Sequence, residues 1–277
     1  MDPLSRAAEA LATADALLIT AGAGMGVDSG LPDFRGDEGF WRAYPPFRAL
    51  GLSFVDLANP AWFSRDPALA WGFYGHRLGL YRATTPHEGF AVLRRWSARA
   101  PGGAFVFTSN VDGAFQRAGF DPQRIVECHG AIDFVQCTRD CGLGIAPADE
   151  VTVEVDPATF RARGPLPSCP RCGGLLRPNI LMFGDWQWSS ERTDAQHARL
   201  ERWLAERAGQ RLCVIECGAG TAIPTVRRLG DQLLRAGHAL VRINVREPEV
   251  APGGFGFARG ARDTLLALDA ALPSRLG

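Results

Sequence analysis

Four of the seven cysteines stand in two close pairs, and this spacing is typical of a metal site. Three residues separate Cys137 from Cys141, two separate Cys169 from Cys172, and 27 residues lie between the pairs. Two such pairs of thiolates can surround one tetrahedral Zn²⁺ ion, with Zn–S distances of about 2.3 Å. Because all four positions would then be filled, the sequence predicts a structural zinc site that activates no water. Four incidental buried cysteines are the alternative.

A glycine-rich segment follows the first apolar run of the chain. The run from Ala16 to Thr20 is followed directly by Gly22-Ala23-Gly24-Met25-Gly26. Glycines at such a turn let the backbone approach a pyrophosphate, and the N-terminus of a following helix attracts negative charge. The dinucleotide fingerprint is G-x-G-x-x-G, however, and here the third glycine comes one position early. For the glycines alone, a tight turn without a ligand stays open as an alternative.

One histidine stands where a catalytic base would be useful. His129 and Gly130 follow the apolar run 125–128, and a residue at the carboxyl end of a parallel strand faces the crevice where α/β folds bind ligands. An imidazole with a pKa near 6.5 can accept a proton around neutrality. We expect structural or surface roles for the other histidines, which are His76, His87, His197 and His238.

The segments that must position these residues alternate between short apolar runs and helix-length stretches. The predicted strands cover residues 16–20, 104–108, 125–128, 212–216 and 239–244, and the predicted helices cover 87–100, 224–236 and 262–272. This alternation predicts an α/β fold in which a doubly wound, Rossmann-like parallel sheet is covered by helices on both faces.

Two stretches interrupt the alternation. Residues 37–85 are rich in Trp, Phe and Tyr, and we expect a helical insertion there. Residues 131–179 carry the paired cysteines, and we expect a smaller zinc-binding module. The Rossmann-like domain would then be assembled from residues 1–36, 86–130 and 180–277.

Composition narrows the class of partner. Thirty basic and thirty acidic residues cancel in this chain of 277 residues, so nothing predicts the positive field that nucleic-acid or anionic-membrane binding requires. Residues 1–14 lack the long apolar core of a secretory signal, and no apolar run approaches the roughly 20 residues that span a bilayer. An odd number of cysteines favours reduced metal ligands over disulfides. We therefore expect a cytoplasmic protein with no nucleic-acid or membrane partner.

The glycine-rich segment continues as GAGMGVDSGLPDFRG from Gly22 to Gly36, and this run closely resembles the signature of the sirtuins, NAD-dependent protein-lysine deacylases. Further segments are similar to sirtuin motifs in the same order: T-S-N-V-D at 108–112, His129-Gly130, R-P-N-I-L-M-F-G-D at 177–185, Gly220-Thr221-Ala222 and Asn244. The resemblance runs from about Ala16 to Asn244, which is most of the chain.

This resemblance implies a reaction and a set of roles. The acyl group of an acylated protein lysine would pass to ADP-ribose with release of nicotinamide, with His129 as general base and Asn110 as a second catalytic residue. Leu181 would offer its carbonyl to the acyl amide, and Phe183-Gly184-Asp185 would pair edge-to-edge with the substrate peptide. The residues implied to bind NAD are Gly22, Ala23, Gly24, Asp33, Phe34, Arg35, Ser109, Asn110, Asp112, Gly220, Thr221 and Asn244.

A further pair concerns the acyl group. Tyr74 and Arg77 are three positions apart, so on a helix they face the same way. In the sirtuin branch that prefers succinyl-, malonyl- or glutaryl-lysine, a Y-x-x-R pair binds the distal carboxylate and a small Ala leaves room for it. Tyr74, Arg77 and Ala58 stand at the matching positions. The resemblance thus implies desuccinylase or demalonylase activity beside deacetylase activity, and a surface ion pair of Arg77 is the alternative.

Some positions depart from the sirtuin pattern. Ser109 replaces a Gln, Ala222 replaces a Ser, Asp185 replaces a Glu, and Trp186-Gln187-Trp188 stands where the family usually has a different loop. Each lost polar contact costs about 1 kcal/mol, so turnover would slow while NAD binding is kept. Two other uses of the pocket stay open: an ADP-ribosyltransferase or NAD glycohydrolase, and a weakly catalytic NAD or ADP-ribose-binding module.

Overall fold

We describe the fold from a computed structural model in which residues 2–32 and 36–272 are defined. Its main sheet has six parallel strands in the order β11-β10-β9-β1-β2-β3. They are β1 (Ala16–Ala21), β2 (Ala104–Thr108), β3 (Ile125–Glu127), β9 (Leu212–Cys217), β10 (Ala239–Ile243) and β11 (Phe255–Phe257). Five of the six lie where apolar runs predict strands, and the predicted doubly wound α/β fold is confirmed.

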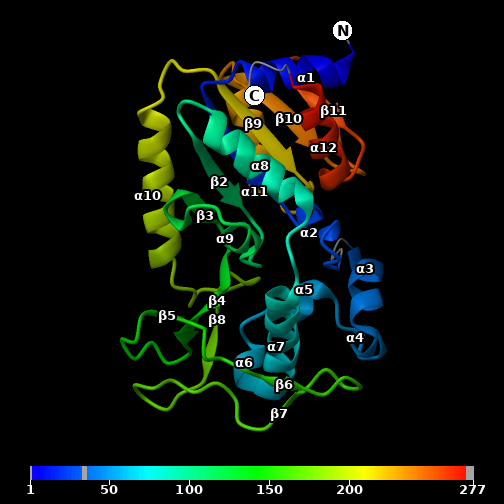
Figure 1. The fold of residues 1–277 in the computed structure, drawn as a ribbon. Coiled ribbons are helices and arrows are strands. Elements are labelled where there is room, and N and C mark those ends of the chain that lie inside the picture. The colour runs from blue at the N-terminus through cyan, green and yellow to red at the C-terminus, as the bar shows by residue number, and fades with distance from the viewer. Residues whose placement is uncertain (1, 33–35, 273–277) are drawn as a thin grey trace.

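Helices cover both faces of this sheet (Figure 1). One layer contains α1 (Pro3–Ala12), α8 (Glu88–Arg99) and α12 (Ala261–Ala271), and the other contains α10 (Glu191–Ala205) and α11 (Thr225–Arg235). Within β1, Leu17 and Ile19 pack into the core under the first layer, and Leu18 packs into the core under the second. Successive residues of a strand point to opposite faces, which is why a strand buried on both sides is a continuous apolar run.

Helix α10 was not predicted, because its buried face is partly polar. The buried residues follow helical spacing but are Thr193, Gln196, Leu200 and Trp203. The polar half of this face hydrogen-bonds strand β3, whereas Leu200 and Trp203 pack in the apolar core. A search for apolar residues at helical spacing therefore finds only half of the buried stripe. Helix α1 and the short strand β11 were also not predicted.

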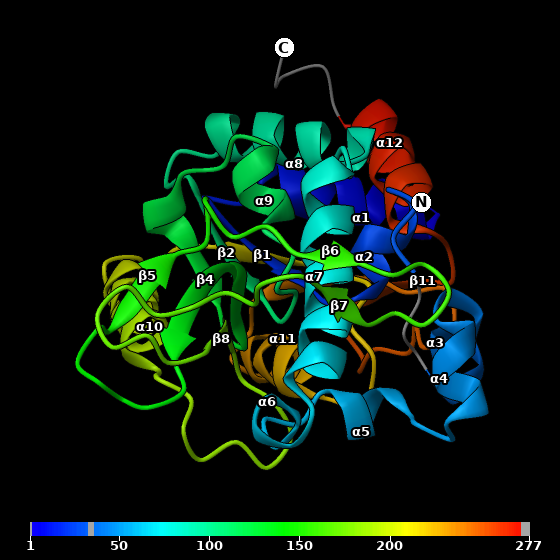
Figure 2. The same ribbon diagram turned by 90° about the horizontal axis from the view of Figure 1, so that it is seen from below.

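A second lobe lies beyond the carboxyl ends of the main strands (Figure 1). It contains the helices α3 (Gly36–Ala43), α4 (Pro45–Ala49), α5 (Phe54–Leu57), α6 (Trp62–Arg65) and α7 (Pro67–Ala83). An antiparallel sheet joins β5 (Ile145–Pro147), β4 (Gly130–Cys137) and β8 (Leu176–Ile180) in that order, and β6 (Glu154–Val155) pairs with β7 (Ala162–Arg163). Figure 2 shows β6 and β7 crossing over α7.

The two insertions in the sequence share one hydrophobic core. The indole Nε1 of Trp71 in α7 donates to the carbonyl oxygen of Leu176 in β8 at 2.8 Å. A Cβ atom on Gly72 would lie 2.0 Å from the carbonyl oxygen of Phe160. Helix α7 therefore packs main chain to main chain against the β6–β7 hairpin at this position. The same core contains aromatic residues of the helical insertion and the buried cysteines Cys137 and Cys169.

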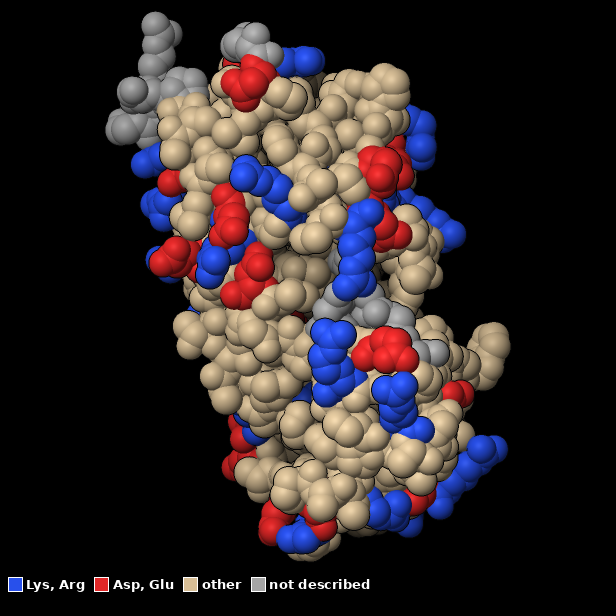
Figure 3. All heavy atoms as spheres, turned by 90° about the vertical axis from the view of Figure 1, so that its right-hand side faces the viewer, with Lys and Arg blue, Asp and Glu red and all other residues tan. Residues whose placement is uncertain are grey.

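Charged side chains of both signs lie on the surface, in agreement with the equal numbers of acidic and basic residues in the sequence. Acidic and basic side chains are interspersed on the face that carries α3, α4 and α12 (Figure 3). Among the residues that the structure defines, no helix is both long enough and apolar enough to cross a bilayer.

Two loops meet in close backbone contact where the chain order reverses, between β1 and β9. The Gly24 amide donates to the carbonyl oxygen of Gly218 at 3.0 Å. A Cβ atom on Gly218 would lie 2.2 Å from the nitrogen of Met25, and one on Gly22 would lie 2.7 Å from the Cα of Ala219. Side chains at these glycines would therefore push the two loops apart.

We expect Gly218→Ala to lower the free energy of unfolding by at least about 3 kcal/mol, because it combines a left-handed φ with a backbone clash. Gly209→Ala is the matched control, since Gly209 also has a positive φ (80°, against 66° at Gly218) but has no atom within 4 Å of the added Cβ. The control should cost about 1–2 kcal/mol. Urea unfolding measures both variants, and equal costs would show that the close approach is unimportant.

Candidate functional site

The predicted site residues come together at the carboxyl edge of the main sheet. Neighbouring strands on the two sides of β1 come from different parts of the chain, so the gap between β1 and β9 is a topological switch point, where open α/β sheets bind ligands. The segment after β1 contains Gly22, Ala23 and Gly24, and the segment after β2 contains Ser109, Asn110 and Asp112. The segment after β3 contains His129, the segment after β9 contains Gly220 and Thr221, and the segment after β10 begins with Asn244. Asp33, Phe34 and Arg35 lie outside the defined residues.

The glycine-rich loop is held mainly by its own backbone. The Gly22 amide donates to the carbonyl oxygen of Cys217 at 2.9 Å, and the Met25 amide donates to that of Gly22 at 2.9 Å. The helix that follows, α2 (Gly24–Val27), is a single turn. Its dipole is correspondingly small, and the loop geometry depends on contact with the Gly218 loop.

The segment after β2 joins this loop through side chains. Asn110 Nδ2 donates to the carbonyl oxygen of Gly22 at 3.0 Å, and the Asn110 amide donates to Thr108 Oγ1 at 3.0 Å. Asp112 is buried, and its carboxylate accepts the Ala114 amide at 2.9 Å. Burial raises the pKa of Asp112, while the hydrogen bond from Ala114 opposes this shift. The segment therefore presents an oriented amide and a buried carboxyl group.

His129 lies between the main sheet and the second lobe. Its carbonyl oxygen accepts the Leu181 amide at 3.0 Å, which ties the end of β3 to the loop after β8. Gly130 has φ of 75°, and a Cβ atom there would lie 2.0 Å from the carbonyl oxygen of Asn179. Burial lowers the pKa of His129, and the backbone carbonyl of Ser109 partly opposes this shift. The imidazole is therefore neutral at pH 7 and can accept a proton.

A buried polar network that was not predicted fixes the strand leading to His129. The Glu127 amide donates to Gln196 Oε1 at 3.0 Å, and the Thr193 hydroxyl donates to the Glu127 carbonyl oxygen at 3.1 Å. Arg192 pairs with the Glu127 carboxylate. Since Glu127 precedes His129 by two residues, this network holds the backbone that carries the imidazole. No spacing rule applied to the sequence connects these residues.

The loops after β9 and β10 are joined to each other. Asn244 Nδ2 donates to the carbonyl oxygen of Ala219 at 2.6 Å. The Thr221 amide donates to Glu247 Oε2 at 3.1 Å, and its hydroxyl also donates to that carboxylate. Glu247 was not among the predicted site residues. These two loops lie on the side of the switch point opposite to His129.

The three residues predicted to select the acyl group are each buried in the second lobe. Ala58 ends α5, and Tyr74 and Arg77 lie on α7. Arg77 donates from Nε and Nη2 to the hydroxyl of Tyr81, at 3.0 and 2.7 Å. Its guanidinium lies 5.2–5.8 Å from the ring centres of Phe54, Phe73, Tyr74 and Tyr81. Arg77 is therefore a buried cation in an aromatic cage, and the alternative of a surface ion pair is wrong.

The hydroxyl of Tyr74 is a buried polar group in this cage with no hydrogen-bond partner among the defined residues. Burial raises its pKa to about 12, so the hydroxyl stays protonated and available as a donor. A buried donor without a partner costs stability unless a ligand supplies the acceptor.

The loop after β8 is exposed, but buried contacts on its inner side hold it in place. Leu181 and Phe183 are 39% and 36% exposed, and the Phe183 amide donates to the carbonyl oxygen of Ala58 at 2.8 Å. Arg177 and Asp185 form a buried ion pair, in which Arg177 Nη1 donates to Asp185 Oδ1 at 3.1 Å. The shorter Asp185 therefore still forms a bidentate pair under the loop.

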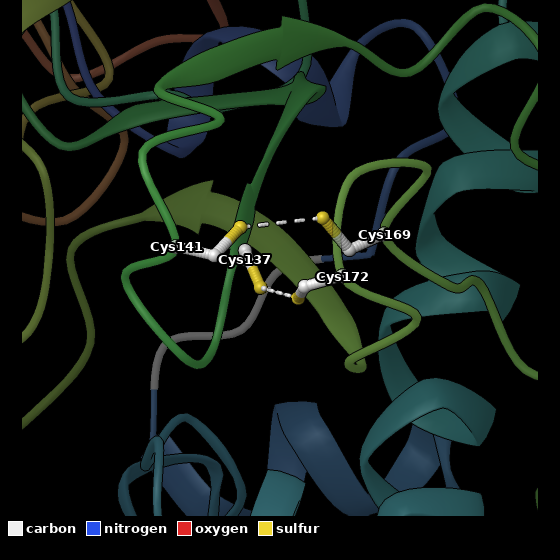
Figure 4. Close-up of side chains that lie close together, drawn as sticks. All are labelled: Cys137, Cys141, Cys169 and Cys172. Carbon is white, nitrogen blue, oxygen red and sulfur yellow. Dashed lines mark hydrogen bonds between the residues drawn. The ribbon is translucent and has the colours of Figure 1, made fainter.

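The four paired cysteines converge on one point (Figure 4). Their sulfur atoms all lie within 4.8 Å of one another, with 3.6 Å between Cys137 and Cys172 and 3.5 Å between Cys141 and Cys169. A tetrahedron with Zn–S bonds of about 2.3 Å has edges of about 3.8 Å, so the donors fit Zn²⁺. Backbone amides donate to two of the sulfurs at 3.4 Å, which stabilises thiolates. Cys128, Cys213 and Cys217 are buried in the core of the main domain, away from this cluster.

Comparisons with known proteins agree with this geometry. A model of the Sir2 family matches residues 22–201. The chain is 32% identical to NAD-dependent protein deacylase 2 of Pyrobaculum aerophilum over 259 residues, which are 94% of the chain and 91% of that protein. It is 35% identical over 192 residues to NAD-dependent protein deacylase sirtuin-5, mitochondrial, of Danio rerio, across 64% of the chain and 59% of that protein. Among solved structures, a mutant Sir2 homologue in complex with ADP-ribose has a TM-score of 0.74 and 25% identity, with 98% of the chain and 96% of the homologue covered.

The cysteine cluster generates a prediction about zinc. We expect about one Zn²⁺ per chain by elemental analysis, and Cys141→Ala should lose the metal and several kcal/mol of the free energy of unfolding. Cys213→Ala is the control, because Cys213 is more deeply buried than Cys141 but lies outside the cluster. It should keep the metal and lose only about 1 kcal/mol. Equal zinc content in the two variants would contradict the assignment.

Proposed function

The chain belongs to the Sir2 family, and from this premise we propose how its own residues carry out NAD-dependent protein deacylation. The reaction class is that of its relatives, which are NAD-dependent protein deacylases, and the cofactors are NAD and Zn²⁺. The observation that carries the proposal is the link between His129 and the Leu181 amide, because it places the base and the exposed substrate loop on one backbone connection.

NAD lies across the switch point in this proposal. Its nicotinamide half lies over the loops after β1, β2 and β3, beside Asn110 and Asp112, because the proton acceptor is there. Its adenosine half then lies over the loops after β9 and β10, beside Thr221 and Asn244. When bound, NAD would supply a ribosyl carbon that exchanges nicotinamide for the acyl oxygen, and a ribose hydroxyl that receives the acyl group.

His129 acts as the general base. Burial lowers its pKa, so the neutral form that can take a proton predominates at pH 7. The hydrogen bond from Leu181 to its carbonyl and the network around Glu127 hold its backbone on both sides. Asn110, whose amide group is oriented by the Gly22 carbonyl, lines the same part of the site.

The substrate peptide pairs with the loop after β8. Phe183 and Gly184 lie in this exposed loop, and an extended peptide can add to such a backbone as a strand. This mode of binding reads backbone rather than side chains, so it fits a protein lysine within varied sequences. The buried ion pair between Arg177 and Asp185 keeps the loop in place.

The acyl group enters the aromatic cage, where we assign a preference for acidic acyl groups. Arg77 supplies a buried positive charge, and Tyr74 supplies a donor without a partner among the defined residues. A distal carboxylate would accept a hydrogen bond from Tyr74 and lie close to the Arg77 charge, whereas an acetyl group carries no such carboxylate.

We place the protein in the cytoplasm. Seven cysteines are free, and the cluster of four requires thiolates rather than disulfides. Reducing compartments maintain such thiols.

Nicotinamide release separates deacylation from NAD glycohydrolysis, and His129→Ala tests the base. We expect release to require an acyl-peptide, and His129→Ala to keep NAD binding while deacylation falls at least ~100-fold. His238→Ala, in the turn after α11, is the control and should remain active. Because burial lowers the pKa of His129, kcat/KM should fall on the acid side only below pH 6.5, where the base becomes protonated. Undiminished deacylation by His129→Ala would refute the assignment.

Arg77 is tested by comparing succinyl- and acetyl-peptides. The wild type should favour the succinyl-peptide in kcat/KM by about 10- to 100-fold, which corresponds to one charge-assisted contact. Arg77→Ala should reverse the order, and Tyr74→Phe should reduce the preference without reversing it. Arg65→Ala, on the exposed end of α6, is the control. Equal rates for both peptides, before and after the Arg77 substitution, would eliminate the acidic-acyl preference.

A further inference from the structure

Arg227 in helix α11 is a charged residue buried among backbone groups. The residue is 8% exposed, and its guanidinium contacts the loops at the carboxyl edge of the main sheet. Nη1 donates to the carbonyl oxygens of Ala219 at 3.4 Å and Glu247 at 2.8 Å, and Nη2 donates to that of Glu249 at 3.1 Å. All three acceptors are main-chain carbonyls, so this arginine fixes backbone positions.

The three carbonyls belong to the two loops that follow β9 and β10. Asn244 Nδ2 shares the Ala219 carbonyl with Arg227, and Asn244 Oδ1 accepts the amides of Arg246 and Glu247 at 3.1 and 3.3 Å. The Glu247 carboxylate in turn accepts from the amide and hydroxyl of Thr221. A closed set of hydrogen bonds therefore joins the two loops, with Arg227 at its centre.

A second arginine supports the same segment from the sheet. Arg242 in β10 donates from Nη1 to the Glu249 carbonyl at 2.7 Å, which is the carbonyl that Arg227 also contacts. Its charge is balanced by Glu216 and Asp231, which it contacts at 2.5 and 2.7 Å. Arg242 thus anchors the segment to the sheet, whereas Arg227 connects it to the loop after β9.

We propose that Arg227 is a positioning residue for NAD, which holds the loops after β9 and β10 at the separation that the adenosine half of the dinucleotide requires. These loops have no regular secondary structure between Gly218 and α11 or between Asn244 and β11. Their relative position depends on side-chain contacts, and Arg227 makes three of these. Loss of the guanidinium would remove the donor to the Glu247 carbonyl and leave the Ala219 and Glu249 carbonyls with only Asn244 and Arg242, so the connection between the two loops through α11 would be lost. The inference rests on the placement of NAD proposed above.

The test is Arg227→Met, which keeps the aliphatic stem and removes the donors. We expect KM for NAD to rise about 10-fold while kcat stays within about twofold, because His129 and its neighbours are untouched. The Kd for ADP-ribose, measured by calorimetry, should weaken by a similar factor, and inhibition by nicotinamide should not change. Arg228→Met is the matched control, since Arg228 is the exposed neighbour of equal charge on the same helix.

Arg227→Lys grades the effect and guards against misfolding. One ammonium group cannot replace a fork that reaches three carbonyls, so an intermediate Kd for ADP-ribose is expected. A wild-type Kd in Arg227→Lys, or values for Arg227→Met that match those for Arg228→Met, would overturn the proposal. A fall in kcat with unchanged KM and Kd would also overturn it. Because ADP-ribose binding needs no acyl-peptide, these outcomes are independent of whether deacylation follows the proposed mechanism.

Discussion

Close backbone contact between the loops after β1 and β9 is the constraint on which the rest of the site depends. Asn110 holds the carbonyl of Gly22, Gly22 abuts the Cα of Ala219, and the carbonyl of Ala219 accepts from Asn244. These contacts connect the segment after β2 to the segment after β10 across the switch point. A side chain at Gly22 would push the Gly22 and Ala219 backbones apart. The two halves of a dinucleotide site would then no longer be held at a fixed distance from each other.

The second feature of the site is that polar contacts inside the protein hold its strand ends. The Glu127 carboxylate, the Arg177–Asp185 pair and the Arg242–Glu216 pair are all buried. Buried ion pairs contribute little net stability, because desolvation offsets much of their attraction, but breaking one partner is costly. Their arrangement here is consistent with a geometric role, since each lies directly beneath a loop that follows a strand. Apolar side chains could fill the same volume, but their contacts have no direction, so they would restrict the orientation of the backbone less than these hydrogen bonds do.

The sequence predicts much of this molecule, and its failures share one physical cause. Apolar runs locate five strands because those strands are buried on both faces, and cysteine spacing identifies the metal ligands because both pairs lie on tight loops. Helix α10 and Arg227 were missed, because their partners are a strand backbone and loop carbonyls that are distant in sequence. Tyr81 was also missed, but the sequence does contain a signal for it, because a residue four positions from Arg77 on one helix lies on the same face. The sequence explains the glycines by a close approach of the backbone to a pyrophosphate. The structure adds a second reason, because Gly22 and Gly218 each lie against the backbone of the other's loop.

Aromatic rings and a phenol hydroxyl surround the buried positive charge of Arg77. Aromatic faces attract a cation only weakly, and a phenol hydroxyl accepts hydrogen bonds without carrying charge. Tyr81 accepts from both Nε and Nη2 of the guanidinium, so a carboxylate would have to approach from the Nη1 side or displace the phenol. Burial makes each such contact stronger than it would be in water. Selection for an acidic acyl group would then come from attraction between its carboxylate and the buried cation, together with a hydrogen bond from the Tyr74 hydroxyl, and the cage need not fit the rest of the acyl chain closely.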